Sequence, residues 1–248
     1  MRIYTPPTRT SRLIRSHRKS VSPETSRPRS DVTGIILAGG LATRLRRPKA
    51  RAKVGGKTLL ERVAYVLRPH CSEIVLSVRP GQDSGTLDAG KALDMVIVSD
   101  HIDHVSPLGG IHAGLAAARE PLCFITATDY PFLSGEVIEL PISRIRDRNA
   151  AAAAIYDVGG ILQPFHSAWR REDWMQIVED ALVSGERSPT QVLKKAINNL
   201  VPPVDILDGS DLEAVDPDRI SFFNINTLER LQEAEAILEK GEANRIVQ

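Results

Sequence analysis

IILAGGLATRLRRPK, residues 35–49, passes from an apolar strand through two adjacent glycines into a series of cations. Glycine allows a sharp turn and a close approach of the backbone, so successive N–H groups can converge on the phosphate oxygens of a ligand. Arg44 and Lys49 place full positive charge beside that turn. The stretch predicts a phosphate site, and the ligand that we expect there is a nucleoside triphosphate.

Two better-known phosphate loops do not fit this stretch. A dinucleotide fingerprint needs three glycines in the order G-x-G-x-x-G, whereas only the pair Gly39 and Gly40 occurs here. The segment Gly56-Lys57-Thr58 is similar to the end of a P-loop, but Arg51 stands where that loop requires its first glycine. Nicotinamide, flavin and Walker-type binding therefore lose their main support.

Strand and helix signals alternate along the chain. We expect strands at 32–37, 73–78, 94–98, 122–127, 150–157, 161–164 and 219–223, and helices at 58–68, 109–118, 135–146, 170–183, 189–197 and 228–240. This order predicts an α/β fold, a Rossmann-like three-layer αβα architecture with a mostly parallel sheet of about seven strands. Ligands of such sheets bind at the C-terminal ends of the strands, where Gly39, Asp100 and Asp129 are expected to meet.

Charge and length divide the chain into two parts. Residues 1–30 hold seven Arg and one Lys against one Glu, a net charge of +7. Because the whole chain has a net charge of +1, the other 218 residues have −6. We expect 1–30 to be a disordered basic extension, because polar segments with prolines cannot offset the entropy of ordering. An organelle transit peptide, an overlong start of the chain and a tail that binds an anionic partner are the alternatives. Residues 31–248 have the length of a single α/β domain, and their mild acidity argues against a nucleic-acid surface.

The cysteines and histidines give weaker indications. Cys71 and Cys123 form no C-x-x-C pair, which indicates a reducing compartment and a cytoplasmic location, and neither is expected to be a nucleophile. No apolar run is long enough to span a membrane. Residues 100–104 read Asp-His-Ile-Asp-His, but histidines three apart outside a helix favour ordinary loop chemistry over a metal centre. His112 and His166 are expected in packing or at the rim of a substrate site.

The order of motifs resembles that of the molybdenum cofactor guanylyltransferases, whose phosphate loop reads roughly LAGGxSxRMGxDKALLxxxG. Residues 37–60 follow that loop, and SPLGG at 106–110, TDYPF at 128–132, QPF at 163–165 and FNINT at 223–227 stand where the family has its further motifs. The resemblance covers 32–240. It implies a nucleotidyltransferase domain over 31–248, of the nucleotide-diphospho-sugar transferase type, that transfers GMP from GTP to molybdenum-molybdopterin with Mg²⁺ and releases diphosphate.

The resemblance also assigns roles to residues. Arg44, Lys49 and Asp129 would be catalytic, with Asp129 also the ligand of Mg²⁺. The nucleotide would contact Leu37, Ala38, Gly39, Gly40, Lys49, Asp100 and Asp129, and the pterin acceptor would contact Gly110, Gln163, Asn224 and Asn226. The residues themselves leave other readings open. Asp129 could cap a helix, Asp100 could be an ordinary loop residue, and the two asparagines could belong to a buried hydrogen-bond network.

Two departures from the family pattern keep alternatives open. Arg46 and Pro48 replace a glycine and an acidic residue of the family loop, and Arg79 follows the second strand where the family often has an asparagine near the base. A CTP-using or other-acceptor relative and a catalytically decayed nucleotide-binding protein are therefore alternatives. The partners expected are GTP, molybdenum-molybdopterin, and chaperones or cofactor-insertion proteins of molybdenum enzymes, with no nucleic acid and no membrane. We expect a monomer or weak oligomer.

Overall fold

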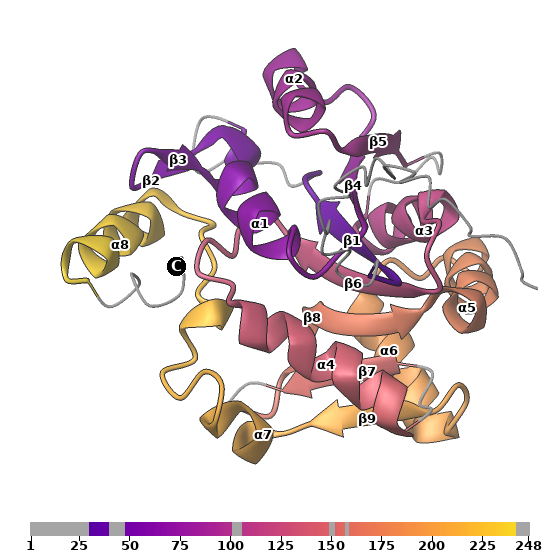
Figure 1. The fold of residues 1–248 in the computed structure, drawn as a ribbon. Helices are drawn as coiled ribbons and strands as arrows, with labels where there is room; N and C mark the ends of the chain where they lie inside the picture. Colours follow the sequence, from indigo (N-terminus) through magenta and orange to yellow (C-terminus); the bar gives the residue numbers. More distant parts are fainter. Residues whose placement is uncertain (1–29, 40–47, 101–105, 149–151, 157–158, 242–248) are drawn as a thin grey trace, which may run out of the picture.

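A seven-stranded sheet forms the centre of the protein in a computed structural model, which describes residues 30–39, 48–100, 106–148, 152–156 and 159–241 (Figure 1). The strands are β1 Val32–Leu37, β4 Glu73–Val78, β5 Val96–Ser99, β6 Leu122–Ala127, β7 Ala152–Tyr156, β8 Leu162–Arg170 and β9 Val204–Leu207. Their order across the sheet is β5-β4-β1-β6-β8-β7-β9. Only β8 is antiparallel to its neighbours among these strands, so the prediction of a mostly parallel sheet is confirmed.

Helices cover both faces of the sheet (Figure 1). They are α1 Leu59–Leu67, α2 Ser84–Ala92, α3 Pro107–Ala117, α4 Gly135–Arg148, α5 Arg171–Val183, α6 Pro189–Asn199, α7 Gly209–Glu213 and α8 Leu228–Glu239. Within the described part of the chain, no helix is both long and apolar enough to cross a bilayer.

Alternation along the strands explains the three layers. Side chains of successive strand residues point to opposite faces of a sheet. In β1, Ile36 packs in the core shared with α1 and α4, whereas Ile35 packs in the core shared with α3, α5 and α6. Both side chains are fully buried, as expected for a parallel strand that is covered on both faces. The three-layer αβα architecture is therefore confirmed.

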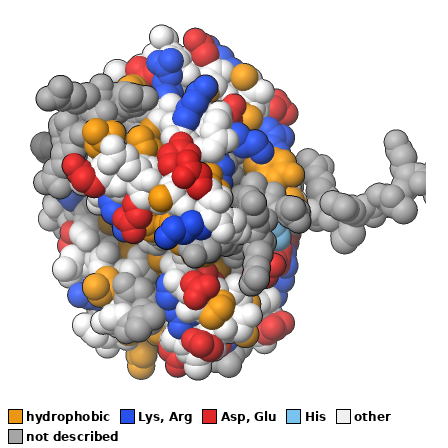
Figure 2. Space-filling view, turned by 90° about the vertical axis from the view of Figure 1, so that its left-hand side faces the viewer, with side chains coloured by type: hydrophobic (Ala, Val, Ile, Leu, Met, Phe, Trp, Pro, Cys, Tyr) orange, Lys and Arg blue, Asp and Glu red, His pale blue; other side chains and the backbone are white. Residues whose placement is uncertain are grey.

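A third, smaller core joins the last described helix, α8, to the hairpin of β2 (Lys53–Val54) and β3 (Lys57–Thr58). Helix α8 lies beside this hairpin (Figure 1), where the Gly55 N–H donates to the Glu235 carboxylate. Arg62 of α1 donates from Nε to the Pro131 carbonyl at 3.2 Å and from Nη1 to the Val54 carbonyl at 3.1 Å. These bonds fix the segment after β6 against the hairpin. On this side of the molecule, acidic and basic described side chains are intermixed (Figure 2).

The expected strand at 219–223 is wrong. Residues Ile220–Phe222 form a short 3₁₀ helix, because the Asp216 carboxylate accepts hydrogen bonds from the N–H groups of Ile220 and Ser221. The strand β9 and the helices α2 and α7 were not expected from the pattern. The strand expected at 161–164 continues through to Arg170, past Pro164. Tertiary contacts outweigh the local signal at 220–222, whereas α2 and α7 begin at local side-chain caps, Asp83 and Asp208.

Candidate functional site

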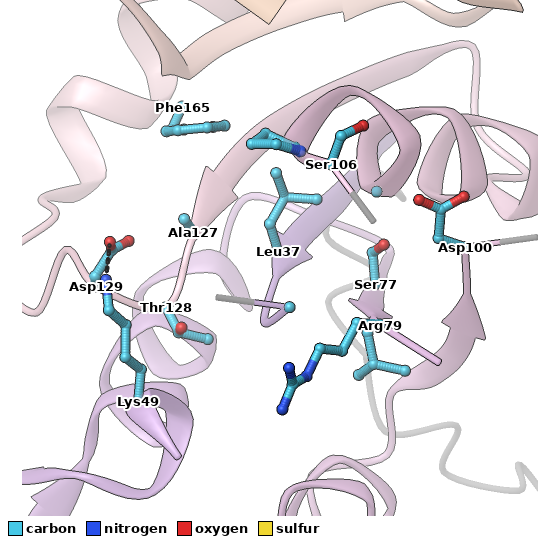
Figure 3. A pocket seen from close by; sticks show the side chains of 14 residues that line it. Leu37, Lys49, Ser77, Arg79, Asp100, Ser106, Ala127, Thr128, Asp129 and Phe165 are labelled. Carbon is cyan, nitrogen blue, oxygen red and sulfur yellow. Dashed lines mark hydrogen bonds and ion pairs between the residues drawn. The ribbon is translucent and has the colours of Figure 1, made fainter. Parts of the chain in front are cut away.

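A cavity of about 330 Å³ lies at the C-terminal ends of β1, β4, β5 and β6, beside the N-terminus of α3 (Figure 3). That volume is within the range of about 300–1,000 Å³ for small-molecule sites. Its described lining residues are Leu37, Gly39, Lys49, Ser77, Val78, Arg79, Asp100, Ser106, Pro107, Gly110, Ala127, Thr128, Asp129 and Phe165. The predicted meeting of Gly39, Asp100 and Asp129 at one edge of the sheet is confirmed.

Two glycines, Gly39 and Gly110, line the cavity. A Cβ atom on Gly110 would lie 3.1 Å from Leu37 Cδ2 and 3.2 Å from Ser77 Oγ, tighter than ordinary packing. A Cβ on Gly39 would contact the backbone of Arg79 at 3.5 Å. Ala38 turns its side chain into the core, and its N–H donates to the Ser77 carbonyl at 2.8 Å. Of these three predicted residues, Gly39 and Gly110 line the cavity and Ala38 supports it from behind.

Lys49 and Asp129 form an ion pair at one side of the cavity, with Lys49 Nζ 3.2 Å from Asp129 Oδ2 (Figure 3). Lys49 begins a 3₁₀ helix directly after Pro48, and Asp129 follows β6. Their side chains are 16% and 21% exposed, so both are partly shielded from water and still open to a ligand. The pair brings together a cation and a carboxylate that are 80 residues apart in the chain.

The backbone around Asp129 is held from two sides. The Thr128 N–H donates to the Leu37 carbonyl at 3.1 Å, and the Asp129 carbonyl accepts from the Ile225 N–H at 2.8 Å. The hydroxyl of Ser134, at the start of α4, accepts from the Val137 N–H. Ser134 therefore supplies the helix cap for which Asp129 was the alternative candidate, and the Asp129 carboxylate stays directed at the cavity.

Asp100 is 4% exposed and lies at the end of β5. Its carboxylate packs against Gly109, where an added Cβ would lie only 2.0 Å from Asp100 Oδ2. Ser106 caps α3 by accepting the Gly109 N–H at 3.0 Å, and Pro107 occupies the first helical position. Asp100 thus lies beside the N-terminus of α3.

Replacing Gly109 by alanine is expected to destabilise the protein by about 1–3 kcal/mol, because the methyl group overlaps the Asp100 carboxylate. Gly110→Ala is the matched control, since its contacts of 3.1 and 3.2 Å need a smaller adjustment. Urea unfolding measures both, and Asp100→Ala combined with Gly109→Ala should remove most of the cost. Equal stability of the two glycine variants would contradict this prediction, because it would show that Asp100 moves away from the added methyl group at no cost in stability.

Three residues expected at the acceptor do not line the cavity. Gln163 lies near the start of β8, and its Nε2 is 3.4 Å from the Ile161 carbonyl. Asn224 shares a side-chain hydrogen bond with the Tyr130 hydroxyl. Asn226 is exposed, beyond the buried Ile225. Their contacts with an acceptor stay predictions.

Some cavity residues were not predicted from the sequence, and some predicted site residues lie outside the described part of the chain. Ser77, Arg79, Thr128 and Phe165 line the cavity but were not predicted to bind a ligand. Phe165 reaches it because β8 runs opposite to β6, so the first residues of β8 lie at the C-terminal end of β6. Gly40, Arg44 and most of the 100–104 segment fall outside the described residues.

Cys71, Cys123 and His166 do not line the cavity. Burial raises the pKa of the Cys123 thiol to about 12 and raises that of Cys71 as well, which agrees with the expectation that neither is a nucleophile. His166 is fully buried between the rings of Tyr130 and Phe222, each with its centroid 4.5 Å away. Its Nε2–H donates to the Ser221 carbonyl at 3.1 Å, which makes His166 a packing residue.

Burial lowers the pKa of His166 to about 3. In the unfolded chain its pKa is about 6.5, so the unfolded state alone takes up a proton as pH falls. The contribution of His166 to the free energy of unfolding is therefore present above about pH 6.5 and is lost progressively toward pH 3. We expect a loss of about 2 kcal/mol between pH 6.5 and 4.5, since each pKa unit is worth about 1.4 kcal/mol and half of the unfolded chains already carry the proton at pH 6.5. Urea unfolding of His166→Gln should show a flatter pH dependence than the wild type. Parallel curves for the two proteins would contradict this account.

A lysine–carboxylate pair in a cavity at the C-terminal ends of parallel strands suits an enzyme that acts on the phosphates of a nucleotide, and the family model places the protein among the nucleotidyltransferases. The chain belongs to the family described as the MobA-like NTP transferase domain, whose model matches residues 34–200.

Named relatives agree with this assignment. A protein of Desulfosudis oleivorans named molybdenum cofactor guanylyltransferase is 34% identical over 211 residues, which cover 85% of this chain and 97% of the relative. One of the same name from Pseudomonas entomophila is 31% identical and covers 77% of this chain and 92% of the relative.

Solved structures show the same fold. The molybdopterin-guanine dinucleotide biosynthesis protein A of Archaeoglobus fulgidus matches with a TM-score of 0.69 at 25% identity, covering 84% of this chain and 99% of that one. The 4-diphosphocytidyl-2C-methyl-D-erythritol synthase of Anaerococcus prevotii matches with a TM-score of 0.63 at 18% identity, over 85% of this chain and 99% of that one. The second likeness concerns the fold alone.

Proposed function

We propose that this nucleotidyltransferase transfers GMP from GTP to molybdenum-molybdopterin, forming the molybdopterin guanine dinucleotide cofactor and releasing diphosphate. The observation that carries the proposal is the Lys49–Asp129 pair, 3.2 Å apart in a cavity at the edge where β1 and β6 end. The names of the relatives supply the identity of the nucleotide and the acceptor.

The chemistry needs charge neutralisation more than proton transfer. The terminal phosphate of the acceptor is already anionic, so it attacks the α-phosphorus of GTP in line without a general base. A bond forms between that phosphate oxygen and the α-phosphorus, and the bond from the α-phosphorus to the bridging oxygen of the β-phosphate breaks. The electron pair leaves with diphosphate. Lys49 leaves its ion pair with Asp129 when the nucleotide binds and pairs with a phosphate oxygen instead. It then neutralises the charge that develops on the departing diphosphate.

Asp129 is the residue that would hold Mg²⁺. Its carboxylate is directed at the cavity, partly exposed, and next to the place proposed for the phosphates. Protein sites hold Mg²⁺ with one or two carboxylates together with substrate phosphates and water, and this donor set fits. When bound, Mg²⁺ supplies positive charge shared between phosphate oxygens. Among the described residues, no cluster of three His, Cys, Asp or Glu side chains could hold a metal ion by itself.

The acceptor and the partners rest on the family alone. We assign Gly110, Gln163, Asn224 and Asn226 to the pterin side, with Arg44 and Gly40 completing the phosphate loop. Gly110 is the one member of the acceptor group that lines the described cavity. Chaperones or cofactor-insertion proteins of molybdenum enzymes are the partners that we expect after release of the product, and the cytoplasm is the expected location.

The experiment is diphosphate release by the purified protein with Mg²⁺, molybdenum-loaded molybdopterin and GTP, CTP, ATP or UTP in turn. Turnover that is selective for GTP and requires the pterin supports the proposal. Preference for CTP would assign the chain to the cytidylyl relatives. They are the second candidate because Arg79 stands where the family often has an asparagine near the base. Binding of GTP without turnover would indicate a decayed binder.

A further inference from the structure

Arg79 lies between Asp100 and Gly39, because β4 lies between β5 and β1 in the sheet. Its side chain lines the cavity. Two cations and two carboxylates are found among the described lining residues, and Lys49 is paired with Asp129. Arg79 Nε is buried and has no hydrogen-bond partner among the described residues, and no ion pair joins the Arg79 guanidinium to any of them.

No ion pair joins Asp100 to Arg79, although the two residues follow neighbouring strands. Val78 and Ser99 stand side by side in the β4–β5 ladder, so Arg79 and Asp100 follow at adjacent positions. In Figure 3 the side chain of Arg79 runs away from Asp100, toward the side of the cavity on which Lys49 lies. A half-buried guanidinium that no described residue neutralises is unfavourable, so we expect this charge to be available for an anionic group of a ligand.

We propose that Arg79 binds the triphosphate of the nucleotide, as a second cation beside Lys49. A guanidinium presents a planar fork of donors that matches two phosphate oxygens, and such charged pairs are stronger than neutral hydrogen bonds. This inference rests on the proposed function only because it requires a nucleoside triphosphate as substrate. A contact of Arg79 with the base would be different, because the arginine would then donate to O6 and N7 of guanine.

The test measures dissociation constants of the wild type, Arg79→Asn and Arg79→Lys for GTP, ATP and inorganic triphosphate by titration calorimetry. We expect Arg79→Asn to weaken all three by the same factor, about 10- to 100-fold, the range for one charged hydrogen-bonded contact. Arg79→Lys keeps the charge and loses the fork, so its loss should be smaller. The loss should also shrink with added salt.

Two outcomes would overturn the inference. A loss confined to GTP, with ATP and inorganic triphosphate unchanged, would make Arg79 a reader of the base. Unchanged affinity for GTP and ATP would remove it from the ligand site altogether.

Controls separate these outcomes from misfolding and from failure of the proposed function. Arg119→Asn is the matched variant, because Arg119 is 79% exposed and follows α3 at the end opposite to the cavity, about 16 Å along the helix. It should bind like the wild type, and thermal unfolding of each variant reports the fold. If the wild type prefers CTP, the guanine assignment fails, and the Arg79 variants are then compared with CTP.

Discussion

Replacing Lys49 by alanine is expected to lower the turnover number about 100- to 1000-fold, the usual cost of losing one donor that stabilises charge in a transition state. Lys49 Nζ lies 3.2 Å from Asp129 Oδ2 in the lining of the cavity, next to the place proposed for the phosphates. The measurement is diphosphate release at saturating nucleotide and acceptor. Binding of the nucleotide should weaken less than turnover, because the charge on the leaving group grows along the reaction.

Lys53→Ala is the matched control for this prediction. Lys53 is an exposed lysine of β2, four residues further along the chain, and it does not line the cavity. Its loss should leave turnover unchanged. A decrease of less than about tenfold for Lys49→Ala would reject the catalytic role of this lysine.

Asp129→Asn is expected to lower turnover about 1000-fold or more, because the amide keeps the shape of the side chain and removes the negative charge that would hold Mg²⁺. The backbone contact of Asp129 with Ile225 is unaffected by this change, so the segment should keep its position. The rate is measured as a function of Mg²⁺ concentration. The residual rate should no longer saturate in the range in which the wild type does.

Asp94→Asn is the control, since Asp94 is an exposed carboxylate whose left-handed backbone, with φ of 51°, accommodates asparagine. It should match the wild type in rate and in Mg²⁺ dependence. An Asp129→Asn variant with a wild-type Mg²⁺ titration would place the metal elsewhere.

The long apolar strands could be predicted from the sequence. Val32–Leu37 and Leu122–Ala127 have the predicted bounds, because a strand covered on both faces leaves an uninterrupted apolar run. Once these strands are parallel neighbours, the residues that follow them must lie at one edge. This is why the sequence alone predicts that Gly39 and Asp129 lie close together.

The rest depends on contacts that no local pattern encodes. Residues 219–223 are apolar enough for a strand, yet a buried carboxylate at Asp216 binds two of their N–H groups and bends them into a 3₁₀ helix. The reversed direction of β8, which brings Phe165 to the cavity, is a property of the whole sheet. The sequence predicts that Asn224 faces an acceptor, whereas its side chain shares a hydrogen bond with Tyr130. That pairing depends on the packing of residues 223–225 against the segment after β6, which no local pattern shows.

The most direct test of the account follows the phosphorus atom that is transferred. The protein is incubated with Mg²⁺, molybdenum-loaded molybdopterin and GTP labelled with ³²P at either the α- or the γ-phosphate, and the products are separated. We predict that the α-label moves into the pterin dinucleotide and that the γ-label leaves in diphosphate. Transfer of the γ-label to the acceptor, or release of the α-label as free GMP with the pterin unlabelled, would contradict nucleotidyl transfer to molybdopterin.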